Sequence, residues 1–218
     1  MTEPLAILPI KSFDHAKQRL RATLDPTTRR VLAEAMFSDV LVALRRSTSI
    51  ERVLVVSGDH GAQRIASGYG AMVVEDKELG HNEAVGLGVQ RALELGAGRA
   101  LLLPGDCPLL DPRELDDLLA RPAARRSAVI VPDRHGTGTN ALLLTPPDAL
   151  APAFGPGSRH RHEALARRAG LEVQTVSVDS LGLDVDTPED LSAVEGVLEA
   201  RHGGAAHTRG MLRQLSRT

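Results

Sequence analysis

Short apolar segments alternate with longer amphipathic segments along most of the 218-residue chain, and this alternation limits the possible folds more than any other feature. Strands that alternate with helices predict a three-layer α/β domain, in which helices cover both faces of a mostly parallel, mixed sheet. The segments that we expect to form strands are 5–10, 52–58, 71–75, 99–106, 128–133, 141–145 and 171–178. The expected helices are 26–46, 60–69, 81–98, one that begins after Asp111, 158–170 and 188–200.

Capping residues mark where several of these helices begin. Asp25 stands before a proline and predicts an N-cap with proline at the first helical position. Asp111 and the glutamate three positions later fit a capping box, and Thr187 is expected to cap the last helix. No repeat or internal linker is visible, so we expect a single domain over residues 1–200. Residues 201–218 are small, polar and basic, and we expect them to form a disordered tail.

Composition argues against several classes of function. Aromatic residues make up only 2% of the chain, too few for a surface on which nucleic-acid bases stack. The net charge of −2 gives no general attraction to nucleic acid or a membrane, and no apolar run reaches membrane-spanning length. The first residues are expected to form a strand rather than a signal peptide. The single cysteine, Cys107, excludes an internal disulfide and suits a cytoplasmic protein. We expect it to be a small core residue without a nucleophilic role.

A single carboxylate, Asp106, ends the apolar segment LLLPGD. Ligands of such sheets bind beyond the carboxyl ends of the strands, so we expect Asp106 at the edge where ligands bind. Gly105 allows a phosphate to approach closely. A carboxylate here suits Mg²⁺, which takes one or two protein carboxylates together with substrate phosphates. A loop aspartate that binds its own backbone is the alternative, and the residues alone do not decide between the two.

Two more aspartates, Asp184 and Asp186, precede the helix that Thr187 is expected to cap. They alternate along an extended segment, and we expect only one of them to face the ligand edge. The start of a helix already favours nearby anions. On the residues alone, support of the helix cap is therefore the better explanation of this pair.

A basic segment, PIKSFDHAKQRL, follows the first expected strand. A dinucleotide-binding fold would carry a glycine fingerprint at this place, but the chain has neither GxGxxG nor a Walker sequence here. Lys11, Lys17 and Arg19 could instead hold a polyphosphate as point charges. A solvated basic loop is the alternative.

Two glycine-rich loops lie in the second half of the chain. Residues 136–140 (GTGTN) precede a strand, and residues 155–158 (GPGS) precede a helix whose first N–H groups can bind an anion, with the two arginines of SRHRH beside it. Ser158 could equally be a plain N-cap, and the two roles are compatible. His160 and His162 have no partners at metal-binding spacing, and we expect both on the surface.

Taken in order, these segments resemble those of a known enzyme family. PIKSFDHAKQRL, LLLPGDCPLL, HGTGTNALLL, FGPGSRHRH and LGLDVDTPEDL are together similar to the guanylyltransferases of coenzyme F(420) synthesis. These comprise the archaeal 2-phospho-L-lactate guanylyltransferases and the actinobacterial phosphoenolpyruvate guanylyltransferases. The resemblance covers residues 5–195. GDCPLL and DVDTPEDL are shared with other nucleotidyltransferases of the glycosyltransferase-A-like fold, whereas the basic segment and the two glycine loops are more specific.

The resemblance implies the glycosyltransferase-A-like fold and the transfer of GMP from GTP to a small phosphorylated carboxylic acid, with Mg²⁺ as cofactor and pyrophosphate as leaving group. It also implies a downstream deazaflavin transferase that takes the product, and it leaves a homodimer open. The roles that it implies are Lys11, Lys17 and Arg19 for catalysis, Thr139, Gly155 and Ser158 for the acid, Ser57, Gly58, Asn82 and Gly105 for the nucleotide, and Asp106 and Asp186 for the metal. Relatives often carry Gly-Leu-Asn where this chain has Gly80-His81-Asn82, so the contacts with the base stay open.

Two alternatives share the same motifs. A nucleotidyltransferase acting on molybdopterin or on a sugar phosphate would share GDxP and DVDTPEDL, but would carry a glycine-rich loop after the first strand, which is absent here. A catalytically silent nucleotide-binding regulator would not need the retained carboxylates and basic segment. Among acceptor acids, the sequence does not decide between phosphoenolpyruvate, 2-phospholactate and 3-phosphoglycerate.

Overall fold

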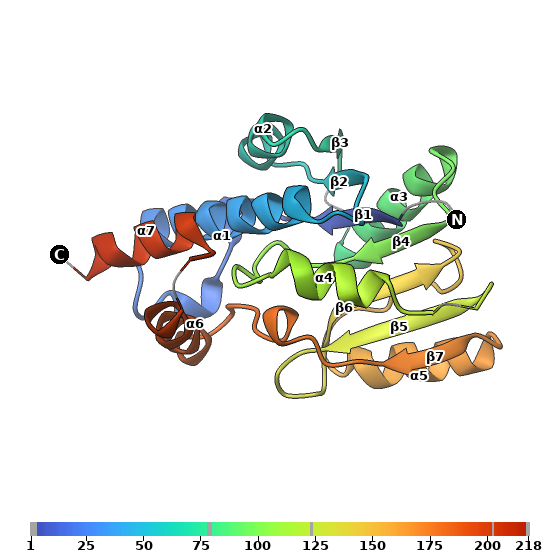
Figure 1. Ribbon diagram of the computed structural model, residues 1–218. Coiled ribbons are helices and arrows are strands. Elements are labelled where there is room, and N and C mark those ends of the chain that lie inside the picture. Colours follow the sequence, from blue (N-terminus) through green and yellow to red (C-terminus); the bar gives the residue numbers. More distant parts are fainter. Residues whose placement is uncertain (1–3, 78–79, 123, 202, 217–218) are drawn as a thin grey trace.

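Seven strands form one sheet at the centre of the protein (Figure 1). The computed structural model describes residues 4–77, 80–122, 124–201 and 203–216. The order of the strands across the sheet is β3-β2-β1-β4-β6-β5-β7. Their bounds are β1 Pro4–Pro9, β2 Arg52–Val56, β3 Met72–Val74, β4 Arg99–Leu102, β5 Ser127–Pro132, β6 Thr139–Thr145 and β7 Glu172–Thr175.

One strand of this sheet is reversed. β1 pairs in parallel with β2 and β4, β2 with β3, and β5 with β7, whereas β6 runs antiparallel to both of its neighbours, β4 and β5. The prediction of a mostly parallel, mixed sheet is therefore confirmed. Because β6 is reversed, its first residue, Thr139, lies at the edge where the other strands end.

Helices cover both faces of the sheet, as the alternation predicts. Alternate residues of β1 face opposite sides: Ala6 and Leu8 pack with helices α1, α2 and α4, and Leu5 and Ile7 pack with α3 and α5. None of the helices in the described part of the chain has the length and apolar character needed to cross a membrane. Their bounds are α1 Pro26–Arg46, α2 His60–Gly68, α3 His81–Glu94, α4 Pro112–Leu119, α5 Ser158–Arg168, α6 Pro188–Ala200 and α7 Ala206–Leu215.

The expected helix caps are present with one difference. The Asp25 carboxylate accepts hydrogen bonds from the backbone N–H groups at 27 and 28, at 2.9 and 3.1 Å, and Thr187 forms a capping box with Asp190. Asp111 caps α4, but Glu114 does not complete a capping box there. Its carboxylate instead accepts a bond of 2.9 Å from the backbone N–H of Ser180, which ties α4 to the segment before α6.

The expectation of a disordered tail after Ala200 is wrong for the described residues 203–216, because these include helix α7 beside α1 (Figure 1). Asp39 of α1 accepts hydrogen bonds from the backbone N–H groups of His207 and Thr208, at 3.0 and 2.8 Å, and so caps α7 from a neighbouring helix. Leu212 is buried in an apolar cluster with residues of α1 and α6. The average composition of this segment did not reveal the few apolar residues with which α7 packs.

Candidate active site

Three adjoining pockets lie beyond the carboxyl ends of the parallel strands. Pro9, Lys11 and His81 line all three. The large pocket, of about 570 Å³, is also lined by Asp106, Thr139 and Ser158. The central pocket, of about 390 Å³, includes Lys17 and Gly105. The small pocket, of about 220 Å³, includes Gly58, Asp76 and Gly80.

Three aspartates from two distant parts of the sequence converge on the large pocket: Asp106, Asp184 and Asp186. The backbone N–H of Val185 donates to the carbonyl oxygen of Asp106 over 3.2 Å and joins the two segments. Val185, which stands between Asp184 and Asp186 in the sequence, is fully buried. The expectation that only one of Asp184 and Asp186 faces the ligand edge is therefore wrong, because residues two apart in an extended chain share a side.

The ammonium group of Lys17 lies between two of these carboxylates. It donates to Asp106, and its distance from an oxygen of Asp186 is 3.1 Å. Burial lowers the pKa of Lys17, but the negative charges of Asp106 and Asp186 outweigh it, and the pKa lies above its ordinary value. The backbone at Lys17 is left-handed, with φ 54°, a conformation that costs energy in a residue other than glycine. The ammonium group of Lys17 is thus a cation shared by the carboxylates of Asp106 and Asp186.

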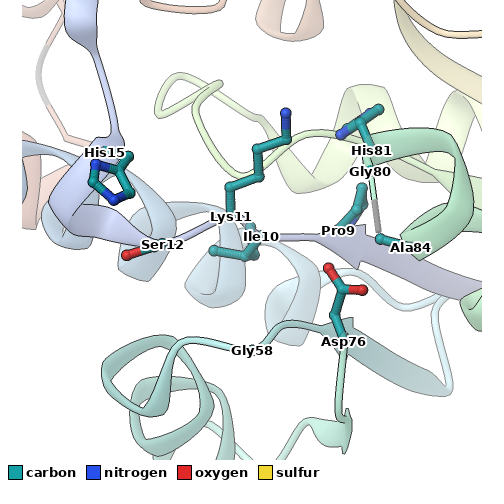
Figure 2. A pocket seen from close by; sticks show the side chains of 10 residues that line it. All are labelled: Pro9, Ile10, Lys11, Ser12, His15, Gly58, Asp76, Gly80, His81 and Ala84. Atoms are coloured by element: carbon teal, nitrogen blue, oxygen red, sulfur yellow. The ribbon is translucent and has the colours of Figure 1, made fainter. Parts of the chain in front are cut away.

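The other two predicted cationic residues are more open to the cleft. Arg19 is largely exposed and lies 3.6 Å from Asp186. Lys11 lines all three pockets, and Figure 2 shows its side chain extending from the loop after β1 towards His81. The structure therefore brings all three predicted cations to the cleft, with Lys17 held by carboxylates and Lys11 at the junction of the pockets.

The charges around the large pocket suit a bound cation. Four aspartates line it (Asp106, Asp133, Asp184, Asp186), against two cationic residues (Lys11, Arg19). One oxygen of Asp106 is buried without a hydrogen-bond partner among the described residues. The pKa of Asp184 is raised by burial and then by the charge of Asp106. In the described part of the chain no three His, Cys, Asp or Glu side chains form a complete metal site, but Mg²⁺ takes only one or two carboxylates when phosphates supply the other ligands.

The predicted acid-binding residues line the far side of the large pocket. Thr139 begins β6, Gly155 comes from the loop before α5, and Ser158 is the first residue of α5. Ser158 is not the helix cap, because Gly157 stands at that position with φ 70°. Two of the first N–H groups of α5 are already engaged: Ser158 donates to the carbonyl of Gly155 (3.0 Å), and Arg159 to that of Thr137 (3.2 Å). The helix start therefore offers fewer free donors than the sequence predicted.

The SRHRH segment holds this loop in place. Arg161 donates to the carbonyl oxygens of Ala153 and Pro156, and Arg159 to that of Gly136. Neither arginine lines the large pocket in the described structure, so the expectation that they stand beside a bound anion is not supported. They fix the backbone of the two glycine loops instead.

The two histidines of the segment differ, and one prediction is wrong. His160 is exposed as expected, but His162 is fully buried, since α5 turns it toward the sheet. Its ring contacts Phe154, with centroids 4.9 Å apart, and lies 3.0 Å from the hydroxyl of Thr139. Position 162 is four residues after Ser158, so the two share a face of the helix. That spacing could have pointed to His162 from the sequence.

The small pocket adds two residues that the sequence argument missed. Figure 2 shows the Asp76 carboxylate directed into the pocket toward the end of β1, and Asp76 is only 8% exposed. His81 lies at the start of α3, where burial and then the charge of Lys11 lower its pKa and keep the imidazole neutral at pH 7. Asp76 follows β3 as Asp106 follows β4, so the strand-end argument could have found it too.

Of the predicted nucleotide-binding residues, two line the pockets and two support the wall of the cleft. Gly58 lines the small pocket and Gly105 the central one. A Cβ at Gly105 would lie 2.4 Å from the terminal methyl group of Ile10, so a side chain there would require Ile10 to move. Ser57 is fully buried and accepts a hydrogen bond from the N–H of Asp59 (3.1 Å), while Asn82 pairs with both backbone groups of Phe154. These two support the cleft wall in the described structure, and their contact with a nucleotide stays a prediction.

Cys107 lies directly after Asp106 and is buried, 1% exposed. Burial, and then the charge of Asp106, raise the pKa of its thiol well above the ordinary value. A neutral, buried thiol is a poor nucleophile. This agrees with the expectation of a core residue.

Comparison with known proteins places this geometry in context. The chain matches the family described as "Guanylyl transferase CofC like" over residues 5–218. It is 57% identical to the phosphoenolpyruvate guanylyltransferase of Conexibacter woesei over 215 residues, which cover 98% of this chain and 96% of that protein. It is 36% identical to the 2-phospho-L-lactate guanylyltransferase of Methanothermobacter thermautotrophicus, covering 96% and 90% of the two chains.

Two further comparisons bear on the acceptor and on the fold. The 3-phospho-D-glycerate guanylyltransferase of Colwellia psychrerythraea is 33% identical, covering 85% of this chain and 88% of that protein. A solved structure of a putative nucleotide-diphospho-sugar transferase from Desulfovibrio desulfuricans G20 superimposes with a TM-score of 0.76 at 20% identity, covering 100% of this chain and 96% of the other. The expected nucleotidyltransferase type of fold is thereby confirmed.

Proposed function

The chain belongs to the family of CofC-like guanylyltransferases, and on this premise we propose that it transfers GMP from GTP to phosphoenolpyruvate, with release of pyrophosphate, as a step of coenzyme F(420) biosynthesis. The observation that carries the choice of acceptor is the 57% identity, over 98% of this chain, to a phosphoenolpyruvate guanylyltransferase. It is supported by the position of Thr139, Gly155 and Ser158 around one pocket.

The reaction needs alignment of two anions rather than a proton acceptor. A phosphate oxygen of the acid attacks the α-phosphorus of GTP, a new P–O bond forms, and the bond to the β-phosphate breaks as pyrophosphate leaves. A phosphomonoester has a second pKa of about 6, so this oxygen is already ionised at neutral pH. No general base is required, and catalysis comes from positioning and charge.

We place the guanine base in the small pocket and the phosphates in the central pocket. The Asp76 carboxylate can accept hydrogen bonds from the adjacent N1–H and 2-amino groups of guanine, whereas adenine and cytosine each place a ring-nitrogen acceptor beside the amino group on this edge. Lys11, which lines all three pockets, would reach the phosphates between base and acid. This arrangement leaves the large pocket to the acid.

The residues at the large pocket fit a magnesium site held by Asp106 and Asp186, with Asp184 beside them. Support comes from the excess of carboxylates and from the unpartnered oxygen of Asp106 in the described structure. When bound, Mg²⁺ would neutralise phosphate oxygens of the substrates and of the leaving pyrophosphate. The ammonium group of Lys17, which donates to both carboxylates in this structure, could then bind a phosphate oxygen instead.

We further propose a cytoplasmic location, where GTP and phosphoenolpyruvate are available, and transfer of the product to a downstream deazaflavin transferase. The use of a single, buried cysteine is compatible with a reducing compartment. Whether the active form is a homodimer is a separate question, which the mass in solution answers.

Another phosphorylated acid is the second candidate, since relatives named for 2-phospho-L-lactate and 3-phospho-D-glycerate are 36% and 33% identical. The test is to incubate the purified protein with GTP, Mg²⁺ and each of the three acids in turn, and in a separate arm with a sugar phosphate, and to identify the products by mass spectrometry. We expect a guanylylated phosphoenolpyruvate and stoichiometric pyrophosphate. Pyrophosphate release only with a sugar phosphate, or GTP binding without any turnover, would overturn the proposal.

A further inference from the structure

We propose that His162 is a positioning residue that orients the hydroxyl group of Thr139 so that its proton points into the large pocket, toward an anionic oxygen of the acceptor. The inference deepens the proposed function and rests on it, because it takes the acid to bind against Thr139. It follows from the hydrogen bonds around the imidazole ring.

The ring of His162 is held in one orientation. It is fully buried and stands edge-on to Phe154, with the centroids 4.9 Å apart and the planes at 74°. Its Nε2 lies 3.0 Å from the backbone nitrogen of Ala153, and its Nδ1 lies 3.0 Å from the Thr139 hydroxyl oxygen. Both ring nitrogens therefore have a partner, and the partners differ in what they can donate.

The backbone contact fixes the tautomer. A backbone N–H can only donate, so Nε2 must accept from Ala153 and carries no proton. Burial, and then the charge of Arg161, lower the pKa of His162 to about 4, so the ring is neutral at pH 7. A neutral imidazole has one N–H, which must then be on Nδ1 and must donate to the oxygen of Thr139.

The tautomer in turn fixes the polarity of the hydroxyl. Because its oxygen accepts from Nδ1, the proton of Thr139 is available for another acceptor, and the hydroxyl makes no other hydrogen bond among the described residues. Thr139 is 8% exposed and lines the large pocket. The hydroxyl therefore presents a donor to the pocket, which suits a carboxylate or phosphate oxygen.

This donor matters because others nearby are engaged. The backbone N–H groups of Ser158 and Arg159 already bond to the carbonyls of Gly155 and Thr137. The same pocket is lined by four aspartates, which repel an anion. A hydroxyl held as a donor before the acid arrives lowers the ordering cost of binding. His162 would thus act on acid recognition without touching the acid.

A matched pair of substitutions separates polarity from packing. The side chains that His162→Gln and His162→Glu introduce have nearly the same shape as each other, and each can accept a hydrogen bond from the N–H of Ala153. The amide of glutamine can still donate to Thr139, whereas a carboxylate can only accept and would turn the hydroxyl proton away from the pocket. We expect His162→Gln to keep most of the kcat/KM for phosphoenolpyruvate. We expect His162→Glu to lose about tenfold or more, with the KM of GTP unchanged in both.

A double-mutant cycle tests whether the effect passes through Thr139. In the Thr139→Val background the hydroxyl is absent, so the ratio of kcat/KM between the glutamine and glutamate variants should fall toward one. An equal ratio in both backgrounds would overturn the inference, because His162 would then act through packing or charge alone. Phosphoenolpyruvate and GTP are the substrates in every arm.

Two safeguards keep the test decisive. If a buried carboxylate prevents folding, as a melting curve would show, His162→Met replaces it. This variant removes the donor without adding charge, and we expect it to lose several-fold in kcat/KM only where Thr139 is present. If the unaltered protein transfers GMP to none of the acids, the proposed function fails. If it does so and the cycle is additive, only the role of His162 fails.

Discussion

Opposite charges hold the polar groups on one side of the cleft, whereas neutral hydrogen bonds hold those on the other. On the first, here called the carboxylate side, Lys17 bridges Asp106 and Asp186 across 89 and 169 residues of sequence. On the second, the hydroxyl side, His162 is bonded to Thr139 and to the backbone of Ala153, and Asn82 is bonded to Phe154.

The difference indicates which side must rearrange during the reaction. The ion pairs of Lys17 have to be exchanged when a cation or a phosphate enters, because its ammonium group already contacts both carboxylates. The hydrogen bonds of His162 can persist, because they leave the Thr139 proton facing the pocket. Substitutions on the carboxylate side should therefore lower turnover, and those on the hydroxyl side should raise the KM of the acid.

Asp106→Asn should have the largest effect, on the carboxylate side. It removes one charge from the pair that Lys17 bridges and one ligand of the proposed magnesium site. We expect kcat to fall by a factor of about 1,000 or more, with little loss of stability, because Asp106 lies in a loop. Pyrophosphate release at increasing Mg²⁺ measures it. Asp14→Asn, in the exposed pair with Arg30, is the control. Near-normal turnover of Asp106→Asn at low Mg²⁺ would remove the metal role.

Leu212→Ala tests whether helix α7 supports the carboxylate side of the cleft and not the hydroxyl side. Leu212 shares its cluster with Leu20, three residues after Lys17, and with Val185, between two of the aspartates. Emptying this position should cost about 2–5 kcal/mol in the free energy of unfolding, and should lower kcat while leaving the KM of the acid unchanged. Urea unfolding and steady-state kinetics measure both. Leu93→Ala, at a position 41% exposed on α3, is the control. If Leu212→Ala lost no more stability and activity than the exposed control, α7 would be dispensable.

Asp76→Asn extends the comparison to the base. An amide offers guanine one acceptor and one donor where a carboxylate offers two acceptors. We expect kcat/KM for GTP to fall about tenfold to a hundredfold, and the preference for GTP over ITP, which lacks the 2-amino group, to fall toward one. The KM of the acid should not change. Equal losses for GTP and ITP together with a lower melting temperature would mean that Asp76 only stabilises its loop.

Ser158→Ala probes the hydroxyl side directly. Ser158 lines the large pocket but is not the N-cap of α5, so its loss should not weaken the helix. Removing one hydrogen bond to a charged group should raise the KM of the acid about tenfold or more and leave that of GTP unchanged. Steady-state kinetics, with the concentrations of the acid and of GTP varied in turn, provide the measurement. A parallel loss for GTP and acid would place Ser158 outside the acid site.

The sequence predicted the layers of the fold and most of the residues around the cleft. Alternating segments and strand ends are local signals, which is why Asp106 and Lys11 could be placed at one edge, whereas Thr139 came from the family resemblance, because the reversal of β6 carries no local signal. Contacts between distant segments carry no such signal. The cap that Asp39 provides to α7 and the hydrogen bond that the Ser180 N–H donates to Glu114 both depend on how segments far apart in the sequence pack together.

Acid pH should weaken the hydroxyl side before the carboxylate side. The ordinary pKa of a histidine is about 6.5, and that of His162 is lowered to about 4 by burial and then by Arg161. Between these values the unfolded chain binds a proton that the folded protein does not. His162 therefore contributes full stability above about pH 6.5 and loses it as the pH falls toward 4. The Lys17 ammonium stays charged throughout, because its pKa is raised.

The expected size of this loss is small but measurable. Lowering the pH from 8 to 5.5 should cost about 1.4 kcal/mol through His162 alone. Urea unfolding at a series of pH values should therefore give a shallower dependence for His162→Gln than for the unaltered protein. His160→Gln, at the exposed histidine two residues earlier, controls for replacing a histidine in α5. An unchanged slope in His162→Gln would mean that the buried ring accepts a proton as readily as the unfolded chain. The fixed tautomer on which the donor role of Thr139 depends would then be lost.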